Sequence, residues 1–548
     1  MVSTFMGLET AKRGLYTSQS ALYTMSQNVA NANTPGYSRQ RVNFAQTTAF
    51  PTPGMNSPMV AGQLGTGVQA ESVQRVRESF LDVQFRNQAN KVGYYGTLSE
   101  SLVKMEEIMN EPTESGLQAT LDKFWKSLQD LSTNTENSGA RAVVAANGQM
   151  VADTLNYYYN SLTSVQKDIG NQITVKEQEI NSILENISEV NRQISEVEPN
   201  GYLPNDLYDK RDALVDSLSQ LVNIKVTNVT PTDYGNAKPI AEGLYNIELI
   251  TKDGQSYTPP VNLVSVNKSG ILGITKVEVT YDQTTTPKMV DGVKFGDRLV
   301  KDTSFTGQLA GLIESYGYMK TDGATTTAAG RYPDMLQKLN NMTEAFVNEF
   351  NKIHRAGFTL NEKLVQDPIT GEMIKDPDPK FANDFFVFES GNAAQSIKVN
   401  DDIRKDPGLI AAGGKSGASA DNENAQKLAD LKKVDFNQYT YLTEDDPLNP
   451  GEKKKLPPGL NGSLDSFYSG LIGAMGVDSQ GAEKNYKNST ILANSVDYNR
   501  QSVSAVSLDE EMTDMIRFQQ AYNASSRVIN MMDEMLDKIV NGLGAGGR

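Results

Sequence analysis

Residue types that carry out nucleophilic or acid–base chemistry are scarce in this sequence. Its 548 residues include no cysteine and one histidine, His354. Disulfides, thiolate metal sites and a cysteine nucleophile are therefore excluded, and a Ser-His-Asp triad would have to use His354. A cluster of histidine metal ligands is excluded as well. We expect His354 to be a structural residue on a helix face, and the sequence predicts no catalytic residue, metal site or cofactor.

Two other short motifs are explained without a catalytic or nucleotide-binding role. Gly414-Lys415-Ser416 matches only the end of a phosphate-binding loop, which needs the form G-x-x-x-x-G-K-S/T. Gly408 lies one residue too far upstream for that spacing, and neither flank has the strand-then-helix pattern. Adjacent carboxylates such as Asp401-Asp402 are expected on solvated faces. We therefore predict no nucleotide site.

An acidic cluster near the C-terminus fits helix capping. Ser507 and Glu510 have the S-x-x-E spacing of a capping box, in which Ser507 accepts from a first-turn amide and Glu510 reaches back to the Ser507 amide. Asp509 and Glu511 would lie at the positive end of the helix dipole, where carboxylates are favourable. Capping, rather than catalysis, accounts for these residues.

Apolar side chains recur every seven residues at both ends of the chain. Near the N-terminus the series is Leu8, Leu15, Leu22 and Val29, with Met25 in the interleaved series. Near the C-terminus the corresponding residues are Leu508, Met515, Phe518, Tyr522, Ile529, Met532, Leu536 and Ile539. Each series is the a/d seam of a helix that must lie against another helix to bury its apolar stripe. The two ends are therefore predicted to be assembly segments.

The alternative is an ordinary antiparallel pair of end helices inside one stable monomer. Several seam positions are small or polar, among them Ala11, Ser18 and Ser525. One such pair would bury modest apolar area, and isolated helices are marginal in water. The composition thus favours ends that order only when neighbouring copies cover more of their surface.

Helix-period and strand-period patterns alternate along the chain, which predicts an elongated, multidomain α+β fold. It would combine terminal coiled-coil-like helices with a helical-bundle domain that carries inserted antiparallel β structure. The expected units are paired terminal helices at 1–44 and 508–548, a helical domain at 45–222, 303–360 and 421–507, an inserted β domain at 223–302, and a smaller mixed insertion at 361–420.

Proline and glycine set several of the expected boundaries. The first helix should begin near Ser3 or Thr4 and end at about Asn31, because a proline and a glycine follow shortly after it. Residues 45–68 are rich in both types and should form an extended loop, with helix resuming at about Ser72. The last helical region should break near residues 477–481.

Charge and hydropathy argue against two kinds of partner. The chain has 51 Lys+Arg against 67 Asp+Glu, a net charge of −16, whereas nucleic acids and anionic membranes call for a basic surface. No stretch approaches the ~20 apolar residues of a membrane span. Residues 1–30 also lack the apolar run of a cleavable leader. We expect no nucleic acid, no membrane insertion, and either a cytosolic location or export without a cleavable signal peptide.

The segment after the first seam carries a resemblance to a known family. Residues 26–40, SQNVANANTPGYSRQ, resemble the N-terminal signature of the bacterial flagellar axial proteins, which form the rod, the hook and the hook–filament junction. The motif residues are Asn31, Asn33, Thr34, Pro35, Gly36 and Tyr37. Segments 506–511, 518–522 and 524–528 resemble the junction members in particular, and the likeness spans essentially the whole chain. One departure is Ala505, where the family usually has glycine.

The resemblance implies a structural adaptor between hook and filament, not an enzyme. It implies export of the unfolded chain through the flagellar type III pathway to an extracellular position in the flagellum. The implied partners are other copies of the chain in a tubular layer, the hook protein, the next hook–filament junction protein, and an export chaperone at the C-terminal helix. Alternatives are another axial protein such as hook or distal rod, a surface adhesin whose β insertion binds a ligand, and an enzyme on an elongated scaffold.

Overall fold

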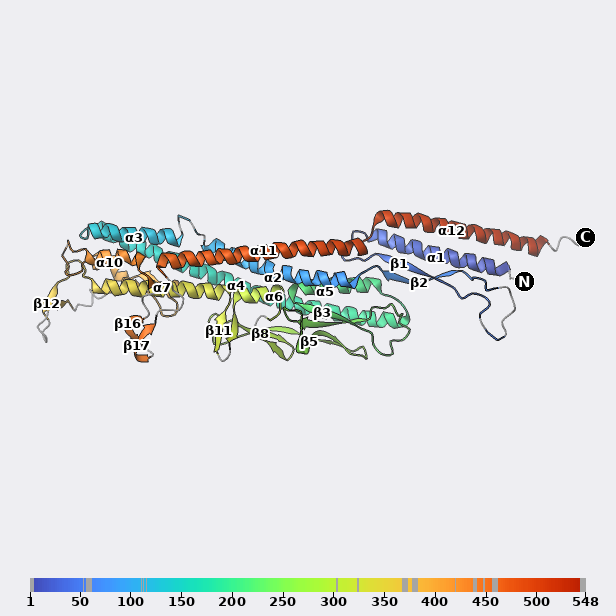
Figure 1. The fold of residues 1–548 in the computed structure, drawn as a ribbon, viewed down its shortest axis with the longest axis horizontal. Helices are drawn as coiled ribbons and strands as arrows, with labels where there is room; N and C mark the ends of the chain where they lie inside the picture. Colours follow the sequence, from blue (N-terminus) through green and yellow to red (C-terminus); the bar gives the residue numbers. More distant parts are fainter. Residues whose placement is uncertain are drawn as a thin grey trace, which may run out of the picture.

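The protein is a long, narrow molecule whose two chain ends lie at the same end of it (Figure 1). The computed structural model describes residues 4–52, 54–55, 62–109, 111, 113–114, 116–301, 304–322, 325–366, 373–376, 383–418, 420–436, 441–446, 449–455 and 462–542. The chain runs away from this end, returns along the molecule, and closes beside its own start. The elongated α+β architecture predicted from the sequence is confirmed.

Two helices, α1 (Thr4–Ala30) and α12 (Leu508–Asp537), form an antiparallel pair at this end. Close contacts occur every seven residues. A Cβ added at Gly7 would lie 2.7 Å from Met532 Cε, and one added at Gly14 would lie 3.0 Å from Ser525 Oγ. The two glycines therefore let the backbones approach closely. The predicted start and end of the first helix agree with α1 to within a residue.

A rod of long helices extends from this pair (Figure 1). Its members are α2 (Ser79–Met109), α3 (Leu117–Thr133), α4 (Ser138–Val197), α5 (Asn205–Leu221), α6 (Gln308–Tyr316), α7 (Arg331–Ala356), α10 (Glu423–Asp430) and α11 (Leu464–Ser504). The predicted break at 477–481 is wrong, because α11 continues through it. Glycines 476 and 481 lie on open surface, and side chains such as Met475 and Ala482, which are buried, hold the helix in place.

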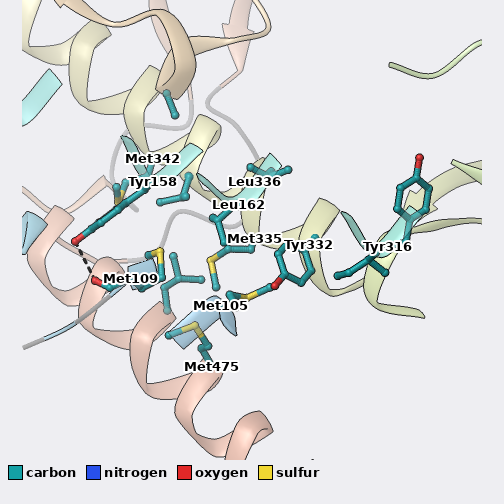
Figure 2. Packing of buried hydrophobic residues seen from close by; sticks show 14 of the residues in the cluster. Met105, Met109, Tyr158, Leu162, Tyr316, Tyr332, Met335, Leu336, Met342 and Met475 are labelled. Carbon is teal, nitrogen blue, oxygen red and sulfur yellow. Dashed lines mark hydrogen bonds between the residues drawn. The ribbon is translucent and has the colours of Figure 1, made fainter. Parts of the chain in front are cut away.

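Methionines from three helices meet in the core of the rod. Met105 of α2, Met335 of α7 and Met475 of α11 gather around α4, where Tyr158 donates its hydroxyl hydrogen to Met109 O at 2.9 Å (Figure 2). Methionine is flexible enough to fill the irregular space between crossing helices. Farther along, Trp125 packs edge-on against Phe346 within a cluster of buried aromatic rings.

Two sheets form the β insertion beside the rod, the first antiparallel and the second mixed (Figure 1). The first has the order β3 (Ile224–Val229), β4 (Leu244–Ile250), β5 (Ser256–Val266) and β6 (Leu272–Ile274). The second contains β7 (Val277–Tyr281), β8 (Val290–Phe295), β9 (Arg298–Val300), β10 (Tyr318–Asp322) and β11 (Thr325–Ala329). Its last two strands lie beyond residue 302, and β10 meets β8 in parallel at Tyr318 and Val290.

A hairpin beside α1 was not expected from the sequence. Strand β1 (Gln40–Gln46) pairs antiparallel with β2 (Val68–Arg75). The prediction that helix resumes at about Ser72 is therefore wrong, since strand continues to Arg75. The remaining small elements are α8 (Ala393–Ser396), α9 (Asp401–Lys405), β12 (Leu364–Gln366), β13 (Met373–Lys375), β14 (Phe386–Val387), β15 (Lys398–Val399), β16 (Tyr441–Asp446) and β17 (Asn449–Lys455).

Candidate functional site at the joint between the chain ends

Asn28 links the two ends of the chain from the last turn of α1. Its side chain is fully buried. The Oδ1 atom accepts from the Tyr37 hydroxyl at 2.8 Å and from Gln40 N at 3.0 Å. The Nδ2 atom donates to Gln40 O at 2.8 Å and to Glu511 Oε2 at 3.0 Å. All the hydrogen-bonding capacity of this amide is thus used: three bonds hold the N-terminal turn against α1, and the fourth reaches the start of α12.

Glu511 receives a second bond from the N-terminal turn. Its carboxylate is fully buried, and Arg39 Nε donates to its Oε1 at 2.7 Å. The Arg39 backbone amide also donates to Ser504 O at 2.8 Å, at the end of α11. Asn28, Tyr37, Arg39 and Glu511 are called the clasp below. The clasp ties residues 28–40 to residues 504–511.

The motif 31–37 supplies the tight turn that brings Tyr37 back beneath α1. The Thr34 amide donates to Asn31 O at 2.9 Å, and the Tyr37 amide donates to Thr34 O at 3.2 Å. Gly36 has φ of +81°, a left-handed conformation that strains any side-chain-bearing residue. Pro35 prevents α1 from continuing. Asn33 is exposed and takes no part in the clasp.

Burial and nearby carboxylates keep Tyr37 a hydrogen-bond donor. Burial raises the pKa of the Tyr37 hydroxyl, and the charges of Asp206, Asp209 and Glu511 raise it further. The hydroxyl therefore stays protonated and continues to donate to Asn28 under all physiological conditions.

The capping box predicted at Ser507 is not formed. Ser507 stands at the N-cap position, but its side chain makes no cap hydrogen bond within the described structure. Glu510 instead binds Arg39 Nη1 at 2.6 Å. A charge-assisted hydrogen bond to a guanidinium is stronger than one to a neutral amide, so Glu510 binds Arg39 rather than the Ser507 amide.

A buried ion network lies directly below the clasp. Its cations are Arg75, Arg77, Arg86, Arg211 and Arg500, and its anions are Asp82, Asp209, Asp212, Asp216 and Glu242. Asp209 Oδ2 accepts from Ser38 N at 3.0 Å, which connects the network to the turn. These residues come from β2, the link between β2 and α2, α2 itself, α5, α11 and the approach to β4. The network therefore fixes the clasp to the rod.

Asp212 is the centre of this network. It lies 3.0 Å from Arg75 Nη1 and 3.0 Å from Arg86 Nη2, and it accepts from the Tyr245 hydroxyl at 3.0 Å. Burial alone would raise the pKa of Asp212. The charges of the surrounding arginines, Arg77 first, outweigh burial and hold this pKa well below its usual range.

Most of the predicted seam residues are at least half-buried in the α1–α12 pair, whereas the two ends of the α12 series are exposed. Met25 is buried, and the remaining members are half-buried: Leu8, Leu15, Leu22, Val29, Met515, Phe518, Tyr522, Ile529, Met532 and Leu536. Leu508 and Ile539 are 48% and 45% exposed. Within one chain the ends thus adopt the antiparallel pair that the sequence left open as an alternative.

The outer side of α12 also carries exposed apolar side chains among polar ones. Met512, Ile516 and Met531 are 57%, 55% and 57% exposed, and Met535 is 42% exposed. Tyr16 and Tyr23 are likewise exposed on α1. The pair therefore hides one set of apolar side chains and leaves another uncovered.

His354 is structural, as expected. Its Nδ1 atom lies 3.1 Å from Asn383 O, and its Nε2 atom accepts from Ala411 N at 3.0 Å. Burial lowers the pKa of His354 to about 4.

The Gly414–Ser416 segment, which resembles the end of a phosphate loop, is filled by the chain's own carboxylate. The amides of Lys415 and Ser416 donate to Asp421 Oδ2 at 2.7 and 2.9 Å.

The buried imidazole of His354 makes the free energy of unfolding depend on pH. His354 is neutral in the folded chain, so the unfolded chain binds the extra proton as pH falls from about 6.5 to about 4. We expect wild type to lose about 3 kcal/mol over this interval relative to His354→Gln. Urea unfolding of both proteins at several pH values measures this difference. A difference that does not change with pH would contradict the assignment.

Comparison with known proteins identifies the family. Family models match residues 8–37 (flagella basal body rod protein), 102–367 (flagellar hook-associated protein FlgK helical domain) and 499–542 (flagellar basal body rod FlgEFG protein C-terminal). Flagellar hook-associated protein 1 of Bacillus subtilis (strain 168) is 43% identical over 100% of both chains. The chain belongs to the flagellar hook-associated protein 1 family. The resemblance to flagellar axial proteins is thereby confirmed.

More distant members of the hook-associated protein 1 family align over nearly the whole length of this chain. The proteins of Escherichia coli (strain K12) and Salmonella typhimurium (strain LT2) are each 24% identical and cover 97% of this chain and 99% and 98% of their own. The hook junction protein FlgK of Burkholderia pseudomallei shares the fold, with a TM-score of 0.52 and 13% identity over 77% of this chain and 100% of its own. The two rod-protein matches contain Asn28, Tyr37 and Glu511 of the clasp, and Arg39 lies two residues beyond the first match. No helix in the described ranges is long and apolar enough to cross a membrane.

Proposed function

We propose that this hook-associated protein is a non-enzymatic structural adaptor between the hook and the filament of the flagellum, and that α1 and α12 are its assembly segment. The observation that carries the proposal is the uncovered apolar side of the end-helix pair. Met512, Ile516 and Met531 are each more than half exposed on one helix. An isolated chain gains nothing from this arrangement, whereas a second copy could cover it.

The energetics favour a lattice of many copies. Burying a Met or Ile side chain is worth about 1.5–3 kcal/mol, less the cost of ordering it. Contacts between different surfaces of successive copies repeat without closing into a dimer, which produces tubes or fibres. The clasp and the ion network would then pass load from this contact into the rod.

Further partners follow from this position. The layer would contact the hook protein on one rim and the next hook–filament junction protein on the other. An export chaperone would cover α12 before assembly, and the chain would reach the outside of the cell through the flagellar type III pathway. The match of residues 102–367 to the hook-associated helical domain favours this position over hook or distal rod.

Charged substitutions on the outer side of α12 test the proposal. The double variant Ile516→Glu with Met531→Glu should leave the isolated chain folded, because both side chains are exposed. It should abolish swimming and release filament subunits into the medium, since buried unpaired charges are costly. Val175→Glu, which places the same charge at a 59% exposed apolar position of α4, away from the end helices, is the matched control and should swim normally. Normal motility of the double variant would contradict the proposal.

A further inference from the structure

A pocket of about 460 Å³ lies between α4 and the β insertion, away from the clasp and the end helices. Its walls come from the middle of α4, from β7 and the turn before β8, and from the end of α6. This volume is within the range of small-molecule sites, which combine apolar walls with a few polar groups. The assembly account gives this pocket no role.

A buried hydrogen-bond acceptor without a partner lies at the inner wall. Gln166 is only 1% exposed and lines the pocket. Its Nε2 atom donates to Tyr316 O at 2.7 Å, whereas its Oε1 atom has no partner among the described residues. A buried unpaired acceptor costs about 1–3 kcal/mol. A ligand that donates a hydroxyl hydrogen to Oε1 would remove this cost.

Two tyrosine rings form the apolar part of the pocket. The rings of Tyr281 and Tyr316 meet edge to face, with centroids 6.2 Å apart. The Tyr316 hydroxyl donates to Lys288 O at 2.7 Å, which fixes that ring. A Cβ at Gly170 would lie 2.8 Å from Tyr316 Cε2, so glycine is needed for the ring to lie against α4. The result is a fixed aromatic surface beside the unpaired amide oxygen.

The charged residues of the lining are both cationic. Lys167 and Lys288 line the pocket, and its described lining includes no carboxylate. Two carboxylates lie just outside this lining: Asp282 Oδ1 accepts from the Thr284 amide at 2.7 Å, and Glu177 Oε2 accepts from the Val279 amide at 3.0 Å. Within the lining itself the two lysines are the groups that can contact an anion directly.

We propose that this pocket binds an acidic sugar, a pyranose ring that carries a carboxylate. The C–H face of the ring would pack on Tyr281, a ring hydroxyl would donate to Gln166 Oε1, and the carboxylate would face Lys288 and Lys167. A phosphate alone offers no apolar face for the tyrosines, and a purely apolar ligand leaves Gln166 unpaired. The acidic sugar satisfies all three features together.

Saturation-transfer NMR on the full chain tests this site with N-acetylneuraminic acid and glucuronic acid as probes and glucose as the neutral comparison. We expect transfer to both acids at millimolar concentrations and much less to glucose. Lys288→Gln, an exposed position, should weaken binding of the acids by roughly twofold to fivefold, as for loss of one exposed ion pair. Tyr281→Ala should weaken binding of both acids by roughly tenfold or more.

The control is Tyr202→Ala, which removes a tyrosine that is 70% exposed outside the pocket and should bind the acids like wild type. Circular dichroism verifies the fold of each variant. Absence of transfer to either acid in wild type would overturn the proposal, and so would equal transfer in Lys288→Gln and wild type. Equal binding of glucose would overturn the charge selection. None of these results depends on motility, so the site can fail without affecting the assembly proposal.

Discussion

Glu511→Ala is expected to detach the end-helix pair from the N-terminal turn. The substitution removes a fully buried carboxylate and leaves Arg39 Nε and one hydrogen of Asn28 without their partner. Breaking a buried charged pair on one side costs about 3–5 kcal/mol. Hydrogen exchange should show that amides of α1 and α12 exchange much faster, while the methionine-rich core of the rod keeps its protection.

The control uses the same arginine. Glu510 also binds Arg39, but its side chain is 64% exposed, so Glu510→Ala should cost less than about 1 kcal/mol. If both variants exchanged at the same rate as wild type, the clasp would not be what holds the chain ends together.

The second large effect is expected from Asp212→Ala. Without this carboxylate, Arg75, Arg77 and Arg86 face one another in a buried space, and the Tyr245 hydroxyl loses its acceptor. We expect a loss of about 3–5 kcal/mol in the free energy of unfolding, measured with urea. Because the pKa of Asp212 is lower in the folded chain, its contribution is complete above about pH 4 and is lost as pH falls below that value.

A surface ion pair provides the comparison for this network. Asp291 lies 3.2 Å from Lys301, whose side chain is 51% exposed. Asp291→Ala should therefore change stability by less than about 1 kcal/mol. Comparable losses in the free energy of unfolding in the two variants would show that burial of the network adds no stability.

The sequence predicted those elements that are determined by residues close together in the chain. Pro35 and Gly36 mark the end of α1, and the seven-residue spacing marks the helix faces that meet in the α1–α12 pair. The β1–β2 hairpin gave no such signal because its buried side chains include Gln40, Ser72 and Arg75. A strand with polar residues on its buried side lacks the apolar alternation by which strands are recognised.

The clasp could not be assembled from local patterns. Asn28 and Glu511 are 483 residues apart in the chain. Local sequence explains Glu511 only through the helix dipole, which favours acidic residues in a first turn. Asn28 itself lies outside both heptad series, one residue before Val29, so the seam spacing does not single it out. The contact between Asn28 and Glu511 becomes visible only when the two ends are brought together.

Photo-crosslinking from position 531 tests the central claim, that the outer side of the end-helix pair contacts other copies. Met531 is 57% exposed, so a photoreactive amino acid can replace it without a change in the fold. The account predicts cross-links between copies in intact flagella and none in secreted monomer, with Tyr202 as a comparison position on the rod. Flagella that contain the substituted chain, carry normal filaments and yield no cross-link from position 531 would contradict it.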